Sequence, residues 1–400
     1  MTIIKQNYKT LIKNIFSAQW KYGIKTLNLA ILISIFLISY YHLSKGFVMS
    51  PDSYWYSKTA DNLINLNFNL YYFFEYPNIN ESFFYIFPIF LIALSKLSFG
   101  AEWQNAFMAF NLILVLFSLI LFSKSLLLLK VRPLAISFAI ILLTLSTDLL
   151  VWPRYMLTDM IFSFLIMMII YLMIKNIVKE KFNYYHLIFF ITLIFLSRPT
   201  AFPFILTIIL FISILKLKIN FRPKLISLSF FLLIIFIPFV LAIFYQLMSV
   251  HFNENPQAVF LIKMVDAGMI IHDRPETWVS SPNSFLEIVN LYFIRFMFFF
   301  APYVKSFSVI HIILNSLQTF FVFFSIFVWF FLGERYKLIN KTVTLILLIC
   351  VSVAAFQAFT LIDYDFRYRF PIIMPLIIIF PISIELLIKK IEERLLNFKI

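Results

Sequence analysis

Long runs of apolar residues, each close to the thickness of a lipid bilayer, restrict the fold of this chain more than any other feature of its sequence. The stretches 27–43, 106–129 and 309–332 are almost wholly apolar, and a helix needs about 20 such residues to cross a bilayer. Strands of a membrane barrel would alternate apolar and polar residues, and these runs do not. Only 13% of the residues are charged, against about 25% in soluble domains. We therefore predict an all-α, polytopic bundle of membrane helices.

The distribution of basic residues predicts how this bundle is oriented, because Lys and Arg concentrate in cytoplasmic loops. If 83–99 crossed the membrane, Lys124, Lys130 and Arg132 would lie outside, so we place 83–99 along the outer surface. The stretch 291–303 is placed there for the same reason. Most of the 33 Lys and Arg residues are then cytoplasmic. We expect about 10 to 12 spans, and the crossings are 27–43, 106–129, 133–151, 159–174, 184–197, 201–215, 225–247, 309–332, 342–361 and 370–388.

The chain is predicted to form one membrane domain over residues 1–400, because no repeat and no Gly/Ser-rich linker divides it. Its extramembrane parts are a basic cytoplasmic N-terminus at 1–25, a first external loop at 44–105, a late external loop at 248–308 and a cytoplasmic tail at 389–400. Both external loops exceed the roughly 12 to 15 residues above which a loop usually has a function or structure of its own. We expect helices at the membrane surface in the first of them.

The sequence lacks the patterns that are typical of several other functions. The net charge of +14 belongs largely to loops that flank membrane helices, so we expect no nucleic-acid partner. Cys350 is the single cysteine, which excludes an intrachain disulfide. No phosphate-binding loop, nucleophile elbow or H-E-x-x-H site is present. We predict no required cofactor and no metal site, although Asp52 and Asp159 have the oxygen ligands that a divalent metal prefers.

The start of the first external loop has the pattern of a short helix with a carboxylate in its first turn. Pro51 suits a first turn, and Asp52 lies near the positive end of the helix dipole. Asp52, Tyr56 and Ala60 share one face at a spacing of four residues. A carboxylate just above the hydrocarbon is well placed to accept a proton from a hydroxyl. The alternatives are a helix cap on a solvated loop and, for the neighbouring tyrosines and Trp55, an interfacial aromatic belt.

Four further polar clusters fall on the same predicted side of the membrane as Asp52. Charged residues at helix ends near lipid are costly unless they are paired or used, and arginine binds phosphate with two parallel hydrogen bonds. Taken singly, each arginine has a structural alternative as an interfacial anchor or ion pair; taken together, the clusters predict one site. The candidates are Arg154 and Asp159 in 152–159, Arg198 in 197–200, His272 and Arg274 in 272–276, and Arg367 and Arg369 in 363–369.

The order of these motifs resembles the GT-C superfamily of membrane glycosyltransferases, and within it the bacterial branch that is similar to dolichyl-phosphate-mannose-protein mannosyltransferases (glycosyltransferase family 39 type). The resemblance rests on Pro51-Asp52-Ser53 with Tyr56, Ala60 and Leu63, on Thr158-Asp159-Met160-Ile161-Phe162, on Arg198-Pro199-Thr200 and on Arg367-Tyr368-Arg369-Phe370-Pro371.

The resemblance implies that Asp52 is the catalytic carboxylate of an enzyme that uses polyprenyl-phosphate sugars. The chain departs from the family at Glu81-Ser82-Phe83-Phe84, where relatives often have an acidic residue or histidine before two prolines. Trp55 replaces an arginine of the aminoarabinose-transferring relatives, so the resemblance does not extend to that donor.

From these patterns we expect an inverting glycosyltransferase that moves a sugar from a polyprenyl-phosphate donor to a hydroxyl of a lipid, glycan or protein acceptor. Asp52 is the expected base. Arg198, Arg367, Arg369 and Arg154 are expected to bind the donor phosphate. The residues expected to position sugar and acceptor are Tyr56, Glu81, Asp159, His272 and Arg274.

We expect this multi-pass protein to lie in the plasma (inner) membrane of a bacterium, in contact with membrane lipids, with its site facing the periplasm or exterior. Two other functions stay open. One is a cell-surface glycan polymerase or ligase that takes lipid-pyrophosphate oligosaccharides, and the other is a transporter of lipid or solute without chemistry.

Overall fold

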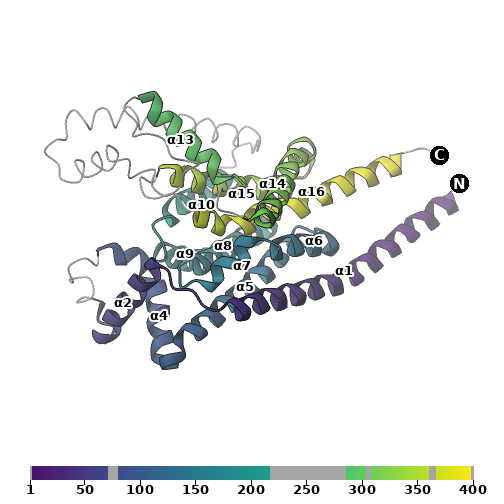
Figure 1. Cartoon of the computed structure of the whole chain (residues 1–400). Coiled ribbons are helices and arrows are strands. Elements are labelled where there is room, and N and C mark those ends of the chain that lie inside the picture. The colour runs from purple at the N-terminus through teal and green to yellow at the C-terminus, as the bar shows by residue number, and fades with distance from the viewer. Residues whose placement is uncertain (1, 71–79, 217–284, 303–307, 360–365, 398–400) are drawn as a thin grey trace.

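The computed structural model of this chain describes residues 2–70, 80–216, 285–302, 308–359 and 366–397 (Figure 1). All regular elements in these residues are helices, which confirms the predicted all-α membrane fold. The elements are α1 (Thr2–Lys45), α2 (Pro51–Asn65), η1 (Asn80–Tyr85), α4 (Ile86–Phe99), η2 (Gly100–Glu102), α5 (Trp103–Leu128), α6 (Pro133–Thr144), α7 (Thr147–Val151), η3 (Trp152–Arg154), α8 (Asp159–Lys179), α9 (Tyr184–Phe195), α10 (Ala201–Lys216), α13 (Phe285–Phe299), α14 (Val309–Leu332), η5 (Gly333–Arg335), α15 (Lys337–Phe359), η6 (Phe366–Arg369) and α16 (Phe370–Asn397).

Six helical segments of the described residues are long and apolar enough to cross a bilayer, and the bent pair of α6 and α7 would make a seventh. This pair bends by 64° at the break between its helices. The helices α9 and α10 are apolar but shorter, with 12 and 16 residues. The predicted crossing 225–247 lies outside the described residues, so the count of 10 to 12 spans stays a prediction.

The helices differ in how deeply they are buried in the bundle. In the apolar windows of α8, α15 and α16, 72%, 78% and 72% of the residues are buried. The corresponding share is 28% in α1 and 28% in α14. The exposed residues of α1 between 29 and 43 are apolar, and those of α14 are apolar except for Ser316. These two helices therefore present apolar surface on the outside of the bundle.

The two ends of the bundle hold different loops. One end, here called the terminal end, contains both chain termini (Figure 1). There the turn before α6 is tied to α16, because Arg132 pairs with Glu392 at 2.5 Å and with Glu385 at 3.8 Å. At the opposite end, here called the site end, the backbone after α1 pairs with the backbone that follows η3, through a bridge between Val48 and Tyr155.

Both the start and the finish of the short helix α4 contact residues at the site end of the bundle. Near its start, the Phe87 amide donates to the Leu196 carbonyl at 3.1 Å. Near its end, Lys96 pairs with Asp61 of α2 at 2.7 Å. Its 14 residues span only about 21 Å, less than a hydrocarbon core of about 30 Å. In this arrangement α2 and α4 form a pair of short helices at the site end.

Candidate functional site

The start of α2 is held by reciprocal serine contacts that set the direction of Asp52. The Ser53 amide donates to the Ser50 hydroxyl at 3.3 Å, and the Ser50 amide donates to the Ser53 hydroxyl at 3.0 Å. Such a capping box satisfies amides that have no partner within the helix, and Pro51 occupies the first turn, as predicted. The Asp52 side chain is 47% exposed, while Tyr56 and Ala60 of the same helix are buried. The helix is therefore packed through one face with its first carboxylate accessible.

Arg367 lies between two carboxylates that come from distant parts of the chain. Its Nη1 donates to Asp52 Oδ2 at 2.8 Å, and its Nε lies 3.9 Å from Asp159 Oδ2. Arg367 belongs to η6, directly before the last membrane helix, whereas Asp52 begins α2 and Asp159 begins α8. Three helix starts therefore meet at this guanidinium.

Asp159 is held from its other side by Arg198, in the loop between α9 and α10. Arg198 Nη1 donates to Asp159 Oδ1, and both side chains are almost completely buried. The position of Asp159 in the first turn of α8 is favourable because the helix dipole stabilises a negative charge there. Burial acts to lower the pKa of Arg198, but the carboxylate of Asp159 outweighs it and the pKa lies above its ordinary value. Arg198 is therefore a permanently charged buried group.

The Tyr368 ring lies beside both arginines. Its ring centre lies 5.5 Å from the guanidinium carbon of Arg198 and 5.4 Å from that of Arg367, within the range of a cation–π contact. We call Asp52, Asp159, Arg198 and Arg367 the carboxylate–arginine cluster. It contains two negative and two positive side chains.

Tyr56 borders the cluster from α2. Its ring contacts Trp55 at 5.1 Å and Tyr85 at 5.4 Å between ring centres. Burial, reinforced by Tyr85, raises the pKa of Tyr56 well above its ordinary value. The hydroxyl therefore stays protonated and can act as a hydrogen-bond donor.

A second ion pair lies beside the cluster, between Arg369 of η6 and Asp148 of α7. Arg369 Nη2 lies 3.1 Å from Asp148 Oδ2, and Arg369 Nη1 donates to the Ala301 carbonyl at 2.6 Å. Asp148 also accepts from Trp152 Nε1 at 3.1 Å. Asp148 is thus held from both sides.

Asp148 and Arg369 form the polar end of an otherwise mainly apolar cavity of about 400 Å³. The lining comes from α13, α14, α15 and α16 and includes Phe296, Phe300 and Phe323. Asn315 of α14 also lines it, and its buried Nδ2 has no hydrogen-bond partner among the described residues. We call this space the apolar cavity.

The structure brings some of the predicted site residues together and separates others. Asp52, Asp159, Arg198 and Arg367 form the cluster, Tyr56 borders it, and Arg369 lies in the adjacent pair. Arg154 is not among them, because it donates to the carbonyls of Lys45 and Gly46 at the end of α1. The side chains of Glu81, His272 and Arg274 lie outside the described residues.

Asp148 is a candidate that the sequence analysis did not name. It is the one acidic residue in the apolar run 133–151, and an ionisable residue within such a run suggests a functional site. That pattern was sufficient to select it. Tyr368 lies within the motif at 367–371, but nothing in the sequence distinguished its ring, or that of Tyr85, among the 20 tyrosines of this chain. The contacts of both rings depend on the packing of distant helices.

Among the described residues, no group of three or more His, Cys, Asp or Glu side chains is arranged to hold a metal ion. No family model, no curated protein and no solved structure matches this chain. What the cluster does must therefore be argued from its own geometry and chemistry.

Proposed function

We propose that this membrane protein is an inverting glycosyltransferase that moves a sugar from a polyprenyl phosphate to an acceptor hydroxyl at the site end. In the proposed step, Asp52 takes the proton of the hydroxyl while its oxygen forms a bond to the anomeric carbon. The bond between that carbon and the phosphate oxygen breaks, and its electron pair stays on the phosphate oxygen. The polyprenyl phosphate is the leaving group. The sugar configuration inverts because the acceptor attacks from the face opposite to the leaving group.

The contact between Asp52 and Arg367 is the observation that carries this proposal. A base must reach its substrate and must be held in a defined direction. The Asp52 carboxylate is half exposed, yet one of its oxygens accepts from Arg367 at 2.8 Å. This combination of access and fixed direction suits a general base better than a helix cap, because the cap of α2 is already supplied by Ser50.

Arg367 is the group that we assign to the leaving phosphate. Its guanidinium is within 4 Å of both Asp52 and Asp159, so a phosphate held there would lie beside the base. A fixed positive charge lowers the barrier where negative charge develops as the bond breaks. Arg198 then acts as a positioning residue, because it is buried and holds Asp159 rather than facing open space.

The apolar cavity supports a lipid-linked donor. A polyprenyl phosphate has a long apolar chain and an anionic head, and this cavity has apolar walls with Arg369 at one end. Arg369 is two residues from Arg367 in η6. A carrier chain in the cavity would therefore bring its phosphate toward the cluster.

The rest of the proposal concerns the membrane face, the acceptor and the supply of the donor. The site faces the periplasm or exterior of a bacterial plasma membrane, the acceptor is a lipid, glycan or protein, and no metal is required for the step described. Another protein has to make the donor and move it across the membrane.

One observation favours a second candidate, a lipid transporter without chemistry. The helices α6 and α7 form a broken segment bent by 64°, and Asp148 lies just after the break, paired with Arg369. Broken helices beside charged residues are typical of transport sites. The two candidates differ in whether the carrier is released from its sugar.

An assay of the purified full-length protein in liposomes distinguishes the two candidate functions. The liposomes are supplied with a panel of polyprenyl-phosphate sugars and with candidate acceptors. We expect release of the polyprenyl phosphate with formation of an inverted glycoside, and loss of this activity by a factor of about 100 to 10,000 in Asp52→Asn. Asp61→Asn is the matched control, because Asp61 lies on the same helix with 54% exposure and pairs with Lys96.

Full activity in Asp52→Asn discards the proposed base. Movement of intact donor between leaflets without carrier release supports the transporter instead.

A further inference from the structure

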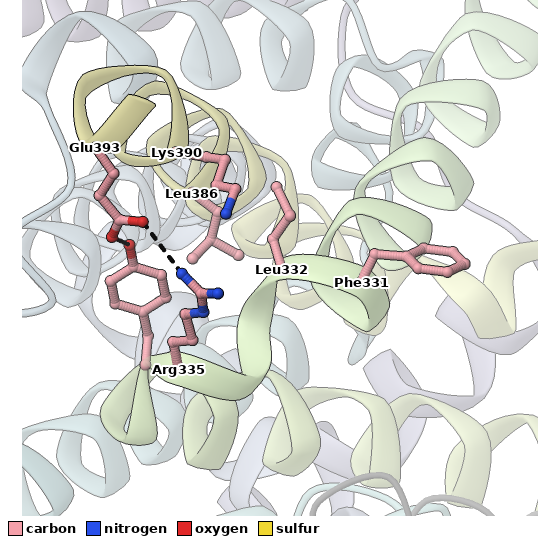
Figure 2. Close-up of a pocket in the computed structure, with 7 residues that line it drawn as sticks. Phe331, Leu332, Arg335, Leu386, Lys390 and Glu393 are labelled. Atoms are coloured by element: carbon pink, nitrogen blue, oxygen red, sulfur yellow. Dashed lines mark hydrogen bonds and ion pairs between the residues drawn. The ribbon is translucent and has the colours of Figure 1, made fainter. Parts of the chain in front are cut away.

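A second cavity lies at the terminal end of the bundle, far from the cluster proposed for catalysis. Its volume is about 410 Å³, and it is formed between the end of α14, η5 and the second half of α16 (Figure 2). It is lined by Phe331, Leu332, Arg335, Tyr336, Leu386, Lys390 and Glu393. We call it the basic pocket.

Two cations from different elements converge on the basic pocket. Arg335 extends from η5 and Lys390 from α16, and their charged groups approach the same space (Figure 2). The Arg335 side chain is 69% exposed, and its Nη1 contacts Glu393 at 3.4 Å. Lys390 makes no hydrogen bond or ion pair with the described residues. Both cations are therefore able to bind an added anion.

The acidic groups near the basic pocket are already engaged. Glu393 accepts from the Tyr336 hydroxyl at 2.9 Å and from Arg335. Glu385 pairs with Lys389 at 3.6 Å and accepts from the Arg132 amide at 3.1 Å. Lys389 also lies 5.3 Å from the centre of the Tyr336 ring. The positive charge of Lys390 is consequently not balanced inside the pocket.

An exposed aromatic stripe leads from the basic pocket along the outer face of α14. Phe331 lines the pocket, and Phe327, Phe324 and Phe320 follow it at intervals of three or four residues, all exposed. Residues at this spacing share one face of a helix. The rings contact one another, with centres 4.6 Å apart for Phe327 and Phe331 and 6.2 Å apart for Phe320 and Phe324. The stripe is long enough to lie along acyl chains.

We propose that the basic pocket binds the phosphate headgroup of an anionic phospholipid, whose acyl chains lie along the aromatic stripe of α14. Arg335 and Lys390 hold the phosphate, because a guanidinium fork and an ammonium both donate to phosphate oxygens. Basic pockets between membrane helices recognise lipid headgroups in this way. The stripe distinguishes a lipid from free phosphate, which has no use for an apolar surface. The predicted orientation puts this lipid in the cytoplasmic leaflet.

Titration of detergent-purified, full-length protein with phosphatidylglycerol or phosphatidylcholine tests the proposal, with bound lipid counted by native mass spectrometry. We expect phosphatidylglycerol to bind more tightly than phosphatidylcholine. Removing each cation, in Arg335→Gln and in Lys390→Gln, is expected to weaken phosphatidylglycerol binding about fivefold. Lys390→Gln is the variant least able to disturb folding, because the side chain has no described partner.

The matched control is the double variant Lys179→Gln with Lys181→Gln, which removes two exposed cations at the end of α8. The proposal expects this control to bind phosphatidylglycerol like the unmodified protein, and an equal loss there would overturn the pocket as a site. Glu393→Gln is expected to bind at least as tightly, because an acidic neighbour is removed. If Glu393→Gln weakened phosphatidylglycerol binding as much as Arg335→Gln, Arg335 and Glu393 would be a structural ion pair and Arg335 would not bind the lipid.

Competition with inorganic phosphate and with glycerol phosphate distinguishes a lipid headgroup from a free phosphate as the ligand of the basic pocket. Neither is expected to displace phosphatidylglycerol at equal concentration, because neither contacts the aromatic stripe. Displacement by inorganic phosphate at equal concentration overturns the lipid assignment. None of these measurements depends on sugar transfer, so they stand or fall separately from the proposed activity.

Discussion

Arg198 donates a hydrogen bond to Asp159 from 39 residues away, and both side chains are almost completely buried. This contact ties the loop before α10 to the start of α8. It also holds the carboxylate that faces Arg367, whose Nε lies 3.9 Å from the other oxygen of Asp159. The position of the accessible Asp52 carboxylate relative to Arg367 therefore depends on a buried pair that itself does not face the substrate space.

Removing one partner of this pair is expected to destabilise the protein. Arg198→Met removes the direct hydrogen bond and leaves the buried Asp159 charge with only the longer 3.9 Å contact to Arg367, which costs about 3 to 5 kcal/mol. The double variant with Asp159→Asn is expected to recover part of that loss. Thermal unfolding in detergent measures both. Asp61→Asn breaks a more exposed pair with Lys96 and is expected to cost at most about 1 kcal/mol; an equally mild Arg198→Met would contradict the structural role.

Arg367→Lys is expected to reduce carrier release without unfolding the protein. A lysine keeps the charge but not the planar fork, and losing one donor to a developing charge lowers turnover by roughly 100- to 1,000-fold. The assay is initial rate at saturating donor. Arg154→Lys serves as control, because Arg154 binds backbone carbonyls at the end of α1, so its rate should stay near that of the unmodified protein.

The orientation of the bundle is testable with reporter fusions. Fusions after Lys130 and Lys181 are expected to lack external reporter activity, because both residues lie in loops predicted to be cytoplasmic. A fusion after Asn65, at the end of α2, is expected to be active outside. External activity at both Lys130 and Lys181 would invert the loops and place the cluster on the inner side.

Gly333→Ala is expected to destabilise the terminal end. A Cβ at this position would lie 2.5 Å from Trp329 Cδ1 and 2.8 Å from Asn340 Oδ1, and those two side chains are joined by a buried hydrogen bond of 2.8 Å. Overpacking of this kind costs about 1 to 3 kcal/mol, visible as a lower unfolding temperature. Gly23→Ala, whose nearest neighbour is Pro133 Cβ at 3.1 Å, is expected to show a smaller change.

Much of the fold follows from local patterns. Apolar length predicted the membrane helices because a helix satisfies its own backbone hydrogen bonds within lipid. The start of α2 was predictable from Pro51 and Asp52, since a first turn depends on neighbouring residues. The number of spans was less accessible, because α9 and α10 are too short to be assigned by length.

The candidate site was predictable only in part. Charge counting placed Asp52, Asp159, Arg198 and Arg367 at one end of the bundle before any contact was known, and the described structure brings them within one cluster. It could not separate Arg154 from them, because an arginine that binds a carbonyl and one that binds a carboxylate have the same sequence pattern.

The sequence by itself therefore determined that this is a helical membrane protein with charged residues at its helix ends, because lipid solvation acts on each segment independently. Only the tertiary structure decided that Arg367 contacts Asp52, from which 315 residues separate it in the sequence, and that Asp148 contacts Arg369. Those pairs depend on which helices pack together, and helix packing is set by the fit of side chains from distant segments rather than by any local pattern.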